Sequence, residues 1–432
     1  MTLENFVKNL QWRGLIHNST PNIEQNLASS SASGYIGFDP TSDSLHIGNL
    51  LQMNVLRHFQ LAGHTPIILL GGATGMIGDP AGKKEERKLL NRETLENNCL
   101  SIQEQMTKFL DFNPSTKNAA KLLNNYDWIK DYSLIDFSRE IGKHITVNYM
   151  MAKDSVKNRI KPNQGSGMSF TEFTYQLLQG FDFYHLYKNY NCTLQMGGSD
   201  QWGNITTGIE LIRRKLNKPA YGITCPLITK EDGSKFGKTE QGNIWLDPKL
   251  TSPFRFYQYW INLSDKEAKK LIKVFTFLNQ VEIENLLLEH QNEPHLRKLQ
   301  STLANELTQL VHSRKDLDVA KTASNILFGR STLHDFKSLS YQNCLDVFEG
   351  LPTACISKEK LNDGFSIIDA LILNQQFFKS KGQAKRAIEA NSISVNKEKV
   401  NQTYQLTSKD LIAQGFILLQ SGKKNYCLLI IN

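Results

Sequence analysis

The feature that most restricts the fold of this chain is a strand, a helix and a strand joined by short links near its beginning. Residues 34–38 have the composition of a buried strand, Leu45 to Leu61 place apolar residues at helical spacing, and residues 65–70 are a second apolar run. Short links between such elements predict two neighbouring parallel strands with a right-handed crossover. The same succession returns further along the chain, at 192–196, 204–216 and 221–228. The sequence therefore predicts an open α/β sheet, which binds ligands beyond the carboxyl ends of its strands.

The rest of the chain differs from this α/β part, which we expect to cover residues 1–248. Residues 249–340 contain runs of helical periodicity and few strand signals, so we expect an α-helical domain there. Residues 341–364 contain two glycines and a proline with little periodicity, which predicts a linker. Residues 365–432 return to a mixed pattern and should form a small α+β domain.

Basic residues are concentrated in the last of these segments. The chain has 50 lysines and arginines against 42 aspartates and glutamates, a formal charge of +8. Residues 365–432 hold nine of the basic and four of the acidic residues, and so a charge of +5. Residues 380–388 have the pattern of an amphipathic helix, and its basic residues are Lys381, Lys385 and Arg386. Such a helix, followed by a strand and a turn, suits the phosphates of RNA, whereas a basic surface without a partner is the alternative.

Cysteine usage and the first residues indicate a compartment. The six cysteines are scattered and none forms a Cys-x-x-Cys pair, which argues against a zinc site and a disulfide scaffold. Residues 1–18 have no unbroken apolar core, so they do not predict a secretory signal. No apolar run approaches the length that spans a membrane. We therefore expect reduced thiols, no dedicated metal site and a cytoplasmic location.

A histidine and a glycine stand where the first predicted strand passes into the first helix. A helix that begins near His46 presents free backbone N–H groups and the positive end of its dipole, which suits phosphate. Gly48 lets a nucleotide approach the backbone closely, and His46 can donate hydrogen bonds to phosphate oxygens. A surface histidine on an ordinary helix is the alternative. The preceding strand favours the phosphate site, because it places the histidine at a strand end.

A glycine-rich segment, residues 71–84, follows the second predicted strand. It is not a Walker phosphate loop, because Ile77 stands where that motif needs a glycine five residues before Gly82. No serine or threonine follows the lysines to bind magnesium either. Glycines directly after a buried strand nevertheless leave backbone exposed where such sheets bind ligands, whereas a surface turn is the alternative.

The predicted helix at 171–182 carries polar residues on one face. Tyr175, Gln179 and Asp182 are spaced at i, i+4 and i+7, so their side chains project from the same side of the helix. This spacing fits either a ligand pocket or a buried hydrogen-bond network.

A polar turn follows the strand at 192–196. Residues 197–204 contain Asp200 and Gln201, and they fit either a binding turn or a plain strand-to-helix turn that Asn204 caps.

Two lysines three residues apart stand in a loop after the last predicted strand of the sheet. In the segment 231–239, Lys235 and Lys238 flank Gly237, which can act as a hinge. Lysines in loops are usually only solvated. Together with the phosphate site at His46, however, this pair can neutralise charge while a phosphate group is attacked.

These motifs, in this order, resemble the two ATP-binding motifs of class I aminoacyl-tRNA synthetases, and the residues between them resemble bacterial tyrosyl-tRNA synthetases. Residues 37–49 are similar to the HIGH region, with Asn49 in place of its second histidine. Residues 78–83 are similar to the family's GDPSGK loop, and residues 235–239 (KFGKT) to its KMSKS loop. Residues 365–432 look like an S4 RNA-binding domain, so the resemblance covers nearly the whole chain.

The resemblance implies a role for each of these residues. It implies that the phenol hydroxyl of tyrosine binds Tyr35 and Asp182, the ammonium group Asp79, Tyr175 and Gln179, and the carboxylate end Gln201. It implies catalytic contacts to the triphosphate from Thr41, His46, Lys83, Arg87, Lys235, Lys238 and Thr239. It implies further ATP contacts from Gly37, Asp39, Gly48, Asn49 and Asp200.

The implied protein is a ligase with a Rossmann-like catalytic domain, a helical domain on the anticodon side and an S4-like domain that binds RNA. It would join L-tyrosine to tRNA(Tyr) at the cost of ATP, with Mg²⁺ accompanying ATP, and would be a homodimer with an interface that includes residues 120–165. Two alternatives remain open. A nucleotidylyltransferase or the tryptophan enzyme also has a His-x-Gly motif. A non-catalytic RNA-binding protein would use the C-terminal segment alone, although the ATP-site residues argue against it.

Overall fold

The chain folds into two compact units. One consists of Met1–Leu250 with Leu263–Leu303, and the other of Thr251–Asn262 with Ala304–Asn432. The computed structural model describes residues 5–81, 90–160, 167–229, 233, 236–239, 242–328, 341, 344–345, 348, 352–375, 377–413, 415–422 and 425–432. For residues 158–159, 238–239 and 326–328 it describes the backbone alone.

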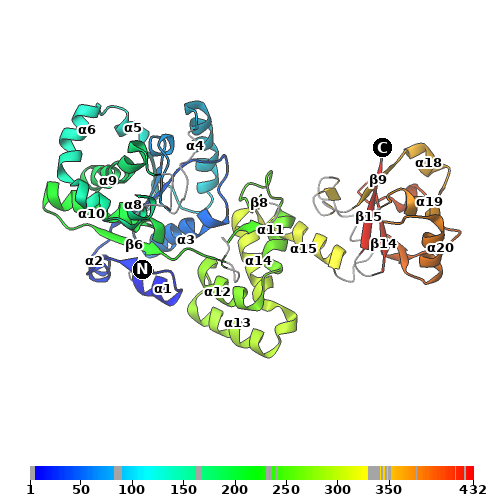
Figure 1. Ribbon diagram of the computed structural model, residues 1–432. Helices are drawn as coiled ribbons and strands as arrows, with labels where there is room; N and C mark the ends of the chain where they lie inside the picture. The colour runs from blue at the N-terminus through cyan, green and yellow to red at the C-terminus, as the bar shows by residue number, and fades with distance from the viewer. Residues whose placement is uncertain are drawn as a thin grey trace. The chain divides into compact units, whose positions relative to one another are not determined.

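A six-stranded sheet organises the first unit (Figure 1). Its strands are β1 (Asn18–Ser19), β2 (Ser33–Phe38), β3 (Thr65–Leu70), β4 (Lys121–Asn124), β5 (Cys192–Gly198) and β6 (Tyr221–Cys225). Their spatial order is β1-β6-β5-β2-β3-β4, and all pairs are parallel except β1 with β6. The predicted parallel α/β sheet is therefore confirmed. The last strand is shorter than predicted because Pro226 lacks the N–H that would continue the ladder.

Helices connect and surround these strands. Those of the first unit are α1 (Phe6–Trp12), α2 (Ile23–Ser29), α3 (Ile47–Leu61), α4 (Arg92–Met106), α5 (Tyr126–Ile129), α6 (Leu134–Glu140), α7 (Val147–Met151), α8 (Asp154–Ile160), α9 (Phe170–Tyr190), α10 (Trp202–Leu216), α12 (Asp265–Phe275) and α13 (Gln280–Asn292). A short hairpin of β7 (Lys238–Thr239) and β8 (Gly242–Asn243) follows the sheet. Single 3₁₀ turns lie at Thr74–Met76, Gly142–His144, Ser199–Gln201 and Pro294–Leu296.

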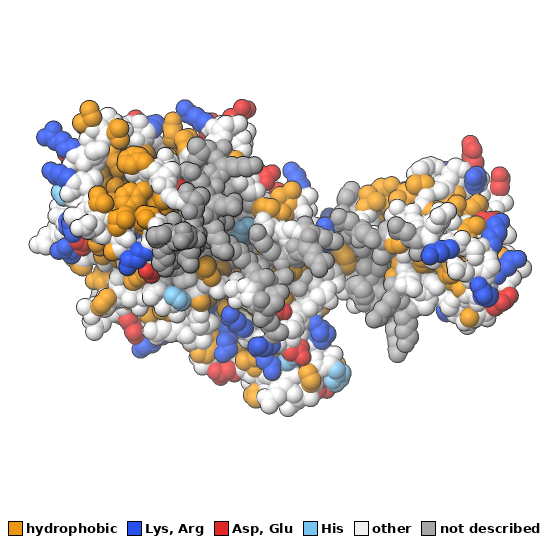
Figure 2. Space-filling view, in the orientation of Figure 1, with side chains coloured by type: hydrophobic (Ala, Val, Ile, Leu, Met, Phe, Trp, Pro, Cys, Tyr) orange, Lys and Arg blue, Asp and Glu red, His pale blue; other side chains and the backbone are white. Residues whose placement is uncertain are grey.

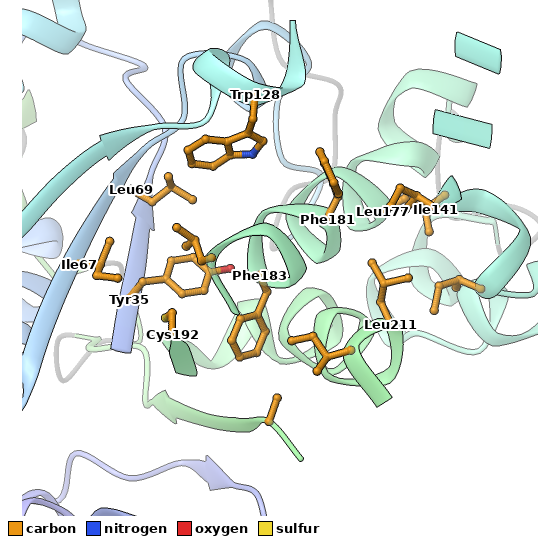
Figure 3. Packing of buried hydrophobic residues seen from close by; sticks show 14 of the residues in the cluster. Tyr35, Ile67, Leu69, Trp128, Ile141, Leu177, Phe181, Phe183, Cys192 and Leu211 are labelled. Carbon is orange, nitrogen blue, oxygen red and sulfur yellow. The ribbon is translucent and has the colours of Figure 1, made fainter. Parts of the chain in front are cut away.

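Apolar residues of β2, β3 and β5 pack against α9 and α10 and form a core beside the sheet. Tyr35 on β2 is buried in this cluster together with Phe181 and Phe183 of α9. Figure 3 shows the Tyr35 ring between β2 and α9, with its hydroxyl oxygen on the side of the helix. A tyrosine in such a core needs a partner for its hydroxyl, which makes this part of the core a place to look for a ligand.

The second unit combines helices with a C-terminal sheet. Its helices are α11 (Pro253–Ile261), α15 (Arg314–Phe328), α18 (Lys358–Asn362), α19 (Ile367–Ile372) and α20 (Lys381–Glu389), and α14 (Lys298–Val311) contributes to both units. Its strands are β9 (Thr353–Ile356), β10 (Phe365–Ser366), β11 (Ile393–Val395), β12 (Glu398–Lys399), β13 (Gln405–Leu406), β14 (Phe416–Ser421) and β15 (Asn425–Ile431). A 3₁₀ turn lies at Ser408–Asp410.

Five of these strands form one sheet in the order β12-β11-β14-β15-β9, while β10 pairs with β13. The predicted helix at 380–388 and the strand expected to follow it correspond to α20 and β11. The segment predicted to be a linker, 341–364, differs from that expectation where it is described. It contains α18 and also β9, which pairs in parallel with β15 at the end of the chain. This pairing leaves no local sequence signal, because the partner strand lies far away in the chain.

Candidate active site

A cavity of about 340 Å³ lies at the carboxyl ends of the parallel strands, where the sheet predicts it. Among its lining residues are twelve of those singled out from the sequence: Tyr35, Gly37, Asp39, Thr41, His46, Asn49, Asp79, Tyr175, Gln179, Asp182, Asp200 and Gln201. Gly48 does not line the cavity but follows His46 at the start of α3. Lys83, Arg87 and Lys235 lie outside the described residues, and for Lys238 and Thr239 only the backbone is described.

One end of the cavity holds a buried carboxylate and a buried phenol. Asp182 is 2% exposed, and its two oxygens accept hydrogen bonds from Asn125 Nδ2 and Trp128 Nε1, both at 2.9 Å. Burial raises the pKa of Asp182 to about 7, although these two hydrogen bonds oppose the rise. The Tyr35 hydroxyl is also buried and has no hydrogen-bond partner among the described protein groups. Burial and the nearby Asp182 raise the pKa of Tyr35 well above its usual value, so the phenol stays protonated.

A chain of hydrogen bonds leads from Asp182 to the first motif. Asn125 donates from Nδ2 to Thr74 Oγ1 at 3.0 Å as well as to Asp182, and Thr74 Oγ1 donates to Asp39 Oδ1 at 2.9 Å. The other oxygen of Asp39 accepts from the Tyr175 hydroxyl at 2.9 Å. Asp39, which the family resemblance assigns to ATP, thus also links the end of β2 to α9. Because buried polar groups of this kind hold one another in place, the cavity wall is rigid before any ligand arrives.

A second polar cluster occupies the neighbouring part of the cavity. Gln201 donates from Nε2 to Asp79 Oδ2 at 2.6 Å, and Gln179 donates to Gln201 Oε1 at 3.2 Å. Asn204, on the first turn of α10, donates to Gln179 Oε1 at 2.9 Å. The predicted residues Asp79, Gln179 and Gln201 are therefore brought together. Such a set of a carboxylate and amide oxygens suits an ammonium group, which only donates hydrogen bonds.

The first motif is built as a helix N-terminus. His46 is the N-cap of α3; its Nδ1 accepts from Gly48 N at 3.0 Å, while Asn49 Oδ1 accepts from His46 N at 3.1 Å. These reciprocal bonds form a capping box, which gives Asn49 a structural role in place of the second histidine. With Nδ1 an acceptor, Nε2 of a neutral His46 carries the proton and is the donor. A side chain at Gly48 would lie 2.8 Å from the His46 ring, so the capped ring requires glycine there.

The second motif lies beside the first. Gly237 O accepts from Ile244 N at 2.9 Å, and Ile244 O accepts in turn from Ile47 N at 3.1 Å. A Cβ at Gly237, where φ is +82°, would lie 3.4 Å from Ile47 Cβ. His46 also forms an antiparallel bridge with Trp245. The backbone of the two motifs, far apart in the sequence, is therefore joined through residues 244–245, as a shared phosphate site requires.

The structure also shows site residues that the sequence motifs did not reveal. Asn125, Trp128, Thr74 and Asn204 make the contacts described above, and Gln195 is a further buried lining residue whose Oε1 has no partner among the described groups. Asn125 directly follows β4, at the same edge of the sheet as the other site residues. Asn125 could have been predicted by looking for a polar residue directly after each parallel strand.

The basic residues assigned to RNA lie in the second unit. Lys381, Lys385 and Arg386 are exposed on α20, opposite the buried Ala384 and Ile388. Lys381 pairs with Asp369 at 2.7 Å, with both side chains largely in solvent. An exposed pair of this kind contributes little to stability, so it leaves the lysine available to another anion.

The described part of the chain contains neither a membrane-spanning helix nor a cluster of metal ligands. None of its helices combines the length and apolar character needed to cross a bilayer. Within the same residues, no group of three or more histidines, cysteines, aspartates and glutamates is placed to hold a metal ion.

Comparisons with known proteins agree with this geometry. Residues 28–329 match the family model "tRNA synthetases class I (W and Y)", and residues 343–429 match the model of a "Tyrosine--tRNA ligase SYY-like C-terminal domain". The chain is 58% identical to a tyrosine–tRNA ligase of Flavobacterium johnsoniae over 98% of this chain and 99% of that protein. It is 54% identical to one of Bacteroides fragilis, over 99% of each.

A solved structure is similar as well. The C-terminally truncated mitochondrial tyrosyl-tRNA synthetase of Aspergillus nidulans matches with a TM-score of 0.67 and 31% identity, over 75% of this chain and 94% of that one. The similarity to the bacterial proteins runs through both units and both motifs. The chain therefore belongs to the tyrosine–tRNA ligases, within the class I tRNA synthetases.

Proposed function

We propose that this chain activates L-tyrosine with ATP and transfers the tyrosyl group to the terminal ribose of tRNA(Tyr). The observation that carries the proposal is the buried pair of Tyr35 and Asp182 beside the two joined motifs. The pair offers a phenol hydroxyl one donor and one acceptor, and the motifs place a helix N-terminus next to it. The full-length similarity to tyrosine–tRNA ligases supports the same reaction.

The chemistry needs no nucleophile from the protein. The tyrosine carboxylate attacks the α-phosphorus of ATP, the bond to the bridging oxygen breaks, and pyrophosphate leaves. A hydroxyl of the terminal ribose of tRNA then attacks the carbonyl carbon of the adenylate, and AMP leaves. The protein's part is to orient the reactants and to stabilise the charge that moves onto phosphate oxygens.

We assign the residues to five parts of the substrates. Tyr35 and Asp182 would bind the phenol hydroxyl; Asp79, Tyr175 and Gln179 the ammonium group; and Gln201 the carboxylate end. Asp200, in the 3₁₀ turn that follows β5, would bind the ribose of ATP, with Gly37, Asp39 and Asn49 forming the nearby wall and Gly48 supplying backbone at the start of α3. Thr41, His46, Lys83, Arg87, Lys235, Lys238 and Thr239 would act on the triphosphate. Mg²⁺ would arrive with ATP rather than occupy a cage of protein ligands.

The test of the function is tyrosine-dependent exchange of pyrophosphate into ATP, measured with each of the twenty amino acids. Exchange with tyrosine alone, followed by charging of tRNA(Tyr), is the expected result. Exchange with tryptophan would identify the related tryptophan enzyme. Binding of RNA without any exchange would identify a non-catalytic RNA-binding protein.

Replacing Tyr35 by phenylalanine should lower selectivity without lowering stability. The hydroxyl is buried without a protein partner, so its removal should leave the free energy of unfolding unchanged or raise it by about 1 kcal/mol. At the same time kcat/KM for tyrosine should fall about tenfold, because the substrate loses a hydrogen bond, while kcat/KM for phenylalanine should not fall. The rule that a polar pocket rejects an analogue lacking its hydroxyl has this enzyme family as its standard illustration.

The selectivity is measured as the ratio of kcat/KM for tyrosine and phenylalanine in pyrophosphate exchange, and the stability by urea unfolding. Tyr184→Phe is the matched control, since Tyr184 is a half-buried tyrosine of α9 outside the cavity. An unaltered ratio in Tyr35→Phe would remove Tyr35 from the pocket.

We also propose that the chain is a homodimer. Helices α6 to α9 expose large apolar side chains: Leu134 (74%), Ile135 (77%), Val147 (62%), Met151 (38%), Ile160 (43%) and Phe170 (75%). Figure 2 shows hydrophobic side chains gathered over this part of the first unit. A second copy of the chain is the occupant that suits them, because the predicted interface, residues 120–165, contains most of these side chains.

Ile135→Asp should convert the dimer into a monomer, because it places a charge in the apolar contact. Sedimentation equilibrium at micromolar concentration should show half the mass of the unsubstituted protein. Leu100→Asp is the control, since Leu100 is 66% exposed on α4, outside this surface. A variant at Ile135 with the mass of the parent would contradict this interface.

The remaining parts of the chain take their roles from this function. We propose that residues 1–248 are the catalytic domain, that 249–340 form the helical domain on the anticodon side, and that 365–432 bind RNA. The parallel sheet supports the first assignment, and helices α11 to α15 support the second. The basic helix α20 supports the third. We also propose a cytoplasmic location, with which the six free cysteines are consistent.

A further inference from the structure

Phe236 of the second motif lies in a turn and packs against an aromatic ring of helix α12. Its side chain is only 8% exposed, and it stacks on Phe275, with 5.7 Å between the ring centroids and 27° between the planes. Phe275 is the last residue of α12 and is 1% exposed. The neighbouring Gly237 has no side chain with which to fix the loop, so this stack is a principal side-chain anchor of the described part of the motif.

The turn that carries Phe275 is itself held by two buried polar side chains. Arg13, 5% exposed, donates from Nη1 to Lys273 O at 2.7 Å and Thr276 O at 2.8 Å, and from Nη2 to Leu278 O at 2.7 Å. Asn54, fully buried on α3, donates to Phe275 O at 2.9 Å. The last carbonyls of a helix need such partners, and a cation there also suits the helix dipole.

These contacts connect the two motifs by a second route. Asn54 belongs to α3, the helix that begins at His46, so the first motif and the turn at Phe275 share one rigid element. The first route is the backbone link from Gly237 through Ile244 to Ile47. Phe236 and Gly237 are therefore fixed from both sides against α3, one through a side chain and one through the backbone.

We propose that the C-terminal turn of α12, held by Arg13 and Asn54, is the platform that positions the second motif to stabilise charge on the triphosphate of ATP. Phe275 and Phe236 form the contact between the platform and the motif. This inference rests on the proposed adenylate-forming activity. Phe275 and Arg13 are positioning residues, since they act through the motif. Their replacement should lower kcat of pyrophosphate exchange while KM for tyrosine stays the same, because the tyrosine cavity does not contain them.

The first experiment compares Phe275→Leu with Phe277→Leu. Phe277 lies on the same turn, but its ring packs against His58, at 4.6 Å, and Arg57, at 4.5 Å, both on α3. Phe275→Leu should lower kcat about tenfold with an unchanged KM for tyrosine, whereas Phe277→Leu should keep the parent kcat. Urea unfolding of both variants shows whether they are folded in the assay. Equal kcat values for the two variants, or a parallel change of kcat and KM in Phe275→Leu, would overturn the proposal.

If Phe275→Leu does not fold, a second pair of variants tests the contact between Phe236 and Phe275. Phe236→Met keeps a large side chain that can pack on the Phe275 ring, whereas Phe236→Ala does not. Phe236→Met should keep most of the kcat and Phe236→Ala should lose it, at the same KM for tyrosine. Equal kcat in both would overturn the proposal. The parent protein is assayed first: absence of tyrosine-dependent exchange there would refute the proposed function, which is a different outcome.

Discussion

Asp182→Asn should reduce kcat/KM for tyrosine activation by about 100-fold, because it removes the only carboxylate at the phenol end of the cavity among the described residues. A hydrogen bond to a charged acceptor is stronger than one to an amide. The new amide also has donors of its own, which would face the Nδ2 donor of Asn125 or the substrate hydroxyl. Pyrophosphate exchange at saturating ATP measures the effect, and kcat/KM for phenylalanine should change much less.

The same carboxylate predicts a pH dependence with a definite sign. Because burial raises the pKa of Asp182 to about 7, the group is partly protonated in the free protein below neutrality. Its ionised form is the better acceptor for the phenol, so kcat/KM for tyrosine should rise with pH up to about 7 and then level off. Asp182→Asn should lack this rise. A parent profile that is flat between pH 5.5 and 8 would contradict the assignment.

Trp128→Phe is the matched control for that profile. Trp128 Nε1 donates to Asp182 at 2.9 Å and thereby lowers the pKa of this carboxyl group. Without the donor the pKa should rise, so the ascending part of the profile should move to higher pH while the activity above it is retained. A structural defect alone would lower the whole profile without moving it.

The free energy of unfolding should depend on pH through the protonation of Asp182. A carboxyl group whose pKa is higher in the folded state than in the unfolded state binds more protons when folded, so stability falls as pH rises between its two pKa values. For Asp182 this window runs from its ordinary value of 3.8 to about 7. The urea midpoint of Asp182→Asn should therefore fall less than that of the parent between pH 5 and pH 7.5.

The fold and the site could be predicted best where a local sequence pattern determines the structure. The strands at 34–38 and 65–70, with the helix between them, are complete apolar patterns, so the parallel sheet and the edge that binds ligands could be predicted from them. His46 and Asp182 could be found because each stands at a recognisable place, a strand-to-helix junction and a polar helix face. The cavity brings both together.

Local sequence patterns do not reveal contacts between single residues that lie far apart in the chain. Asn125 follows a four-residue strand that has no buried residue, and Trp128 belongs to a one-turn helix, so neither stands in a strong pattern. The hydrogen bonds of Ile244 and the stack of Phe236 on Phe275 depend on how whole elements pack. The role of Asn49 as a capping-box acceptor required the backbone geometry at His46, because the sequence shows only an amide in place of an imidazole.

Removing the three basic residues of α20 should weaken tRNA charging and leave amino-acid activation intact. Lys381, Lys385 and Arg386 are exposed, and alanine favours helix, so the triple alanine variant should keep the fold. Each lost phosphate contact should reduce the slope of log affinity against log salt by about 1, which makes the total reduction about 3. The KM for tRNA(Tyr) should rise about tenfold or more at moderate salt, while tyrosine-dependent pyrophosphate exchange stays at the parent rate.

A control variant separates a local effect from a general loss of charge. Lys108, Lys117 and Lys188 are exposed in the first unit, and their triple replacement by alanine removes the same charge. If α20 binds the RNA backbone, the control should keep nearly the parent salt dependence, because screening limits the reach of each charge to about 10 Å at 0.1 M salt. Equal losses in both variants would show that only net charge matters, and an unchanged slope in the α20 variant would refute its assignment to RNA.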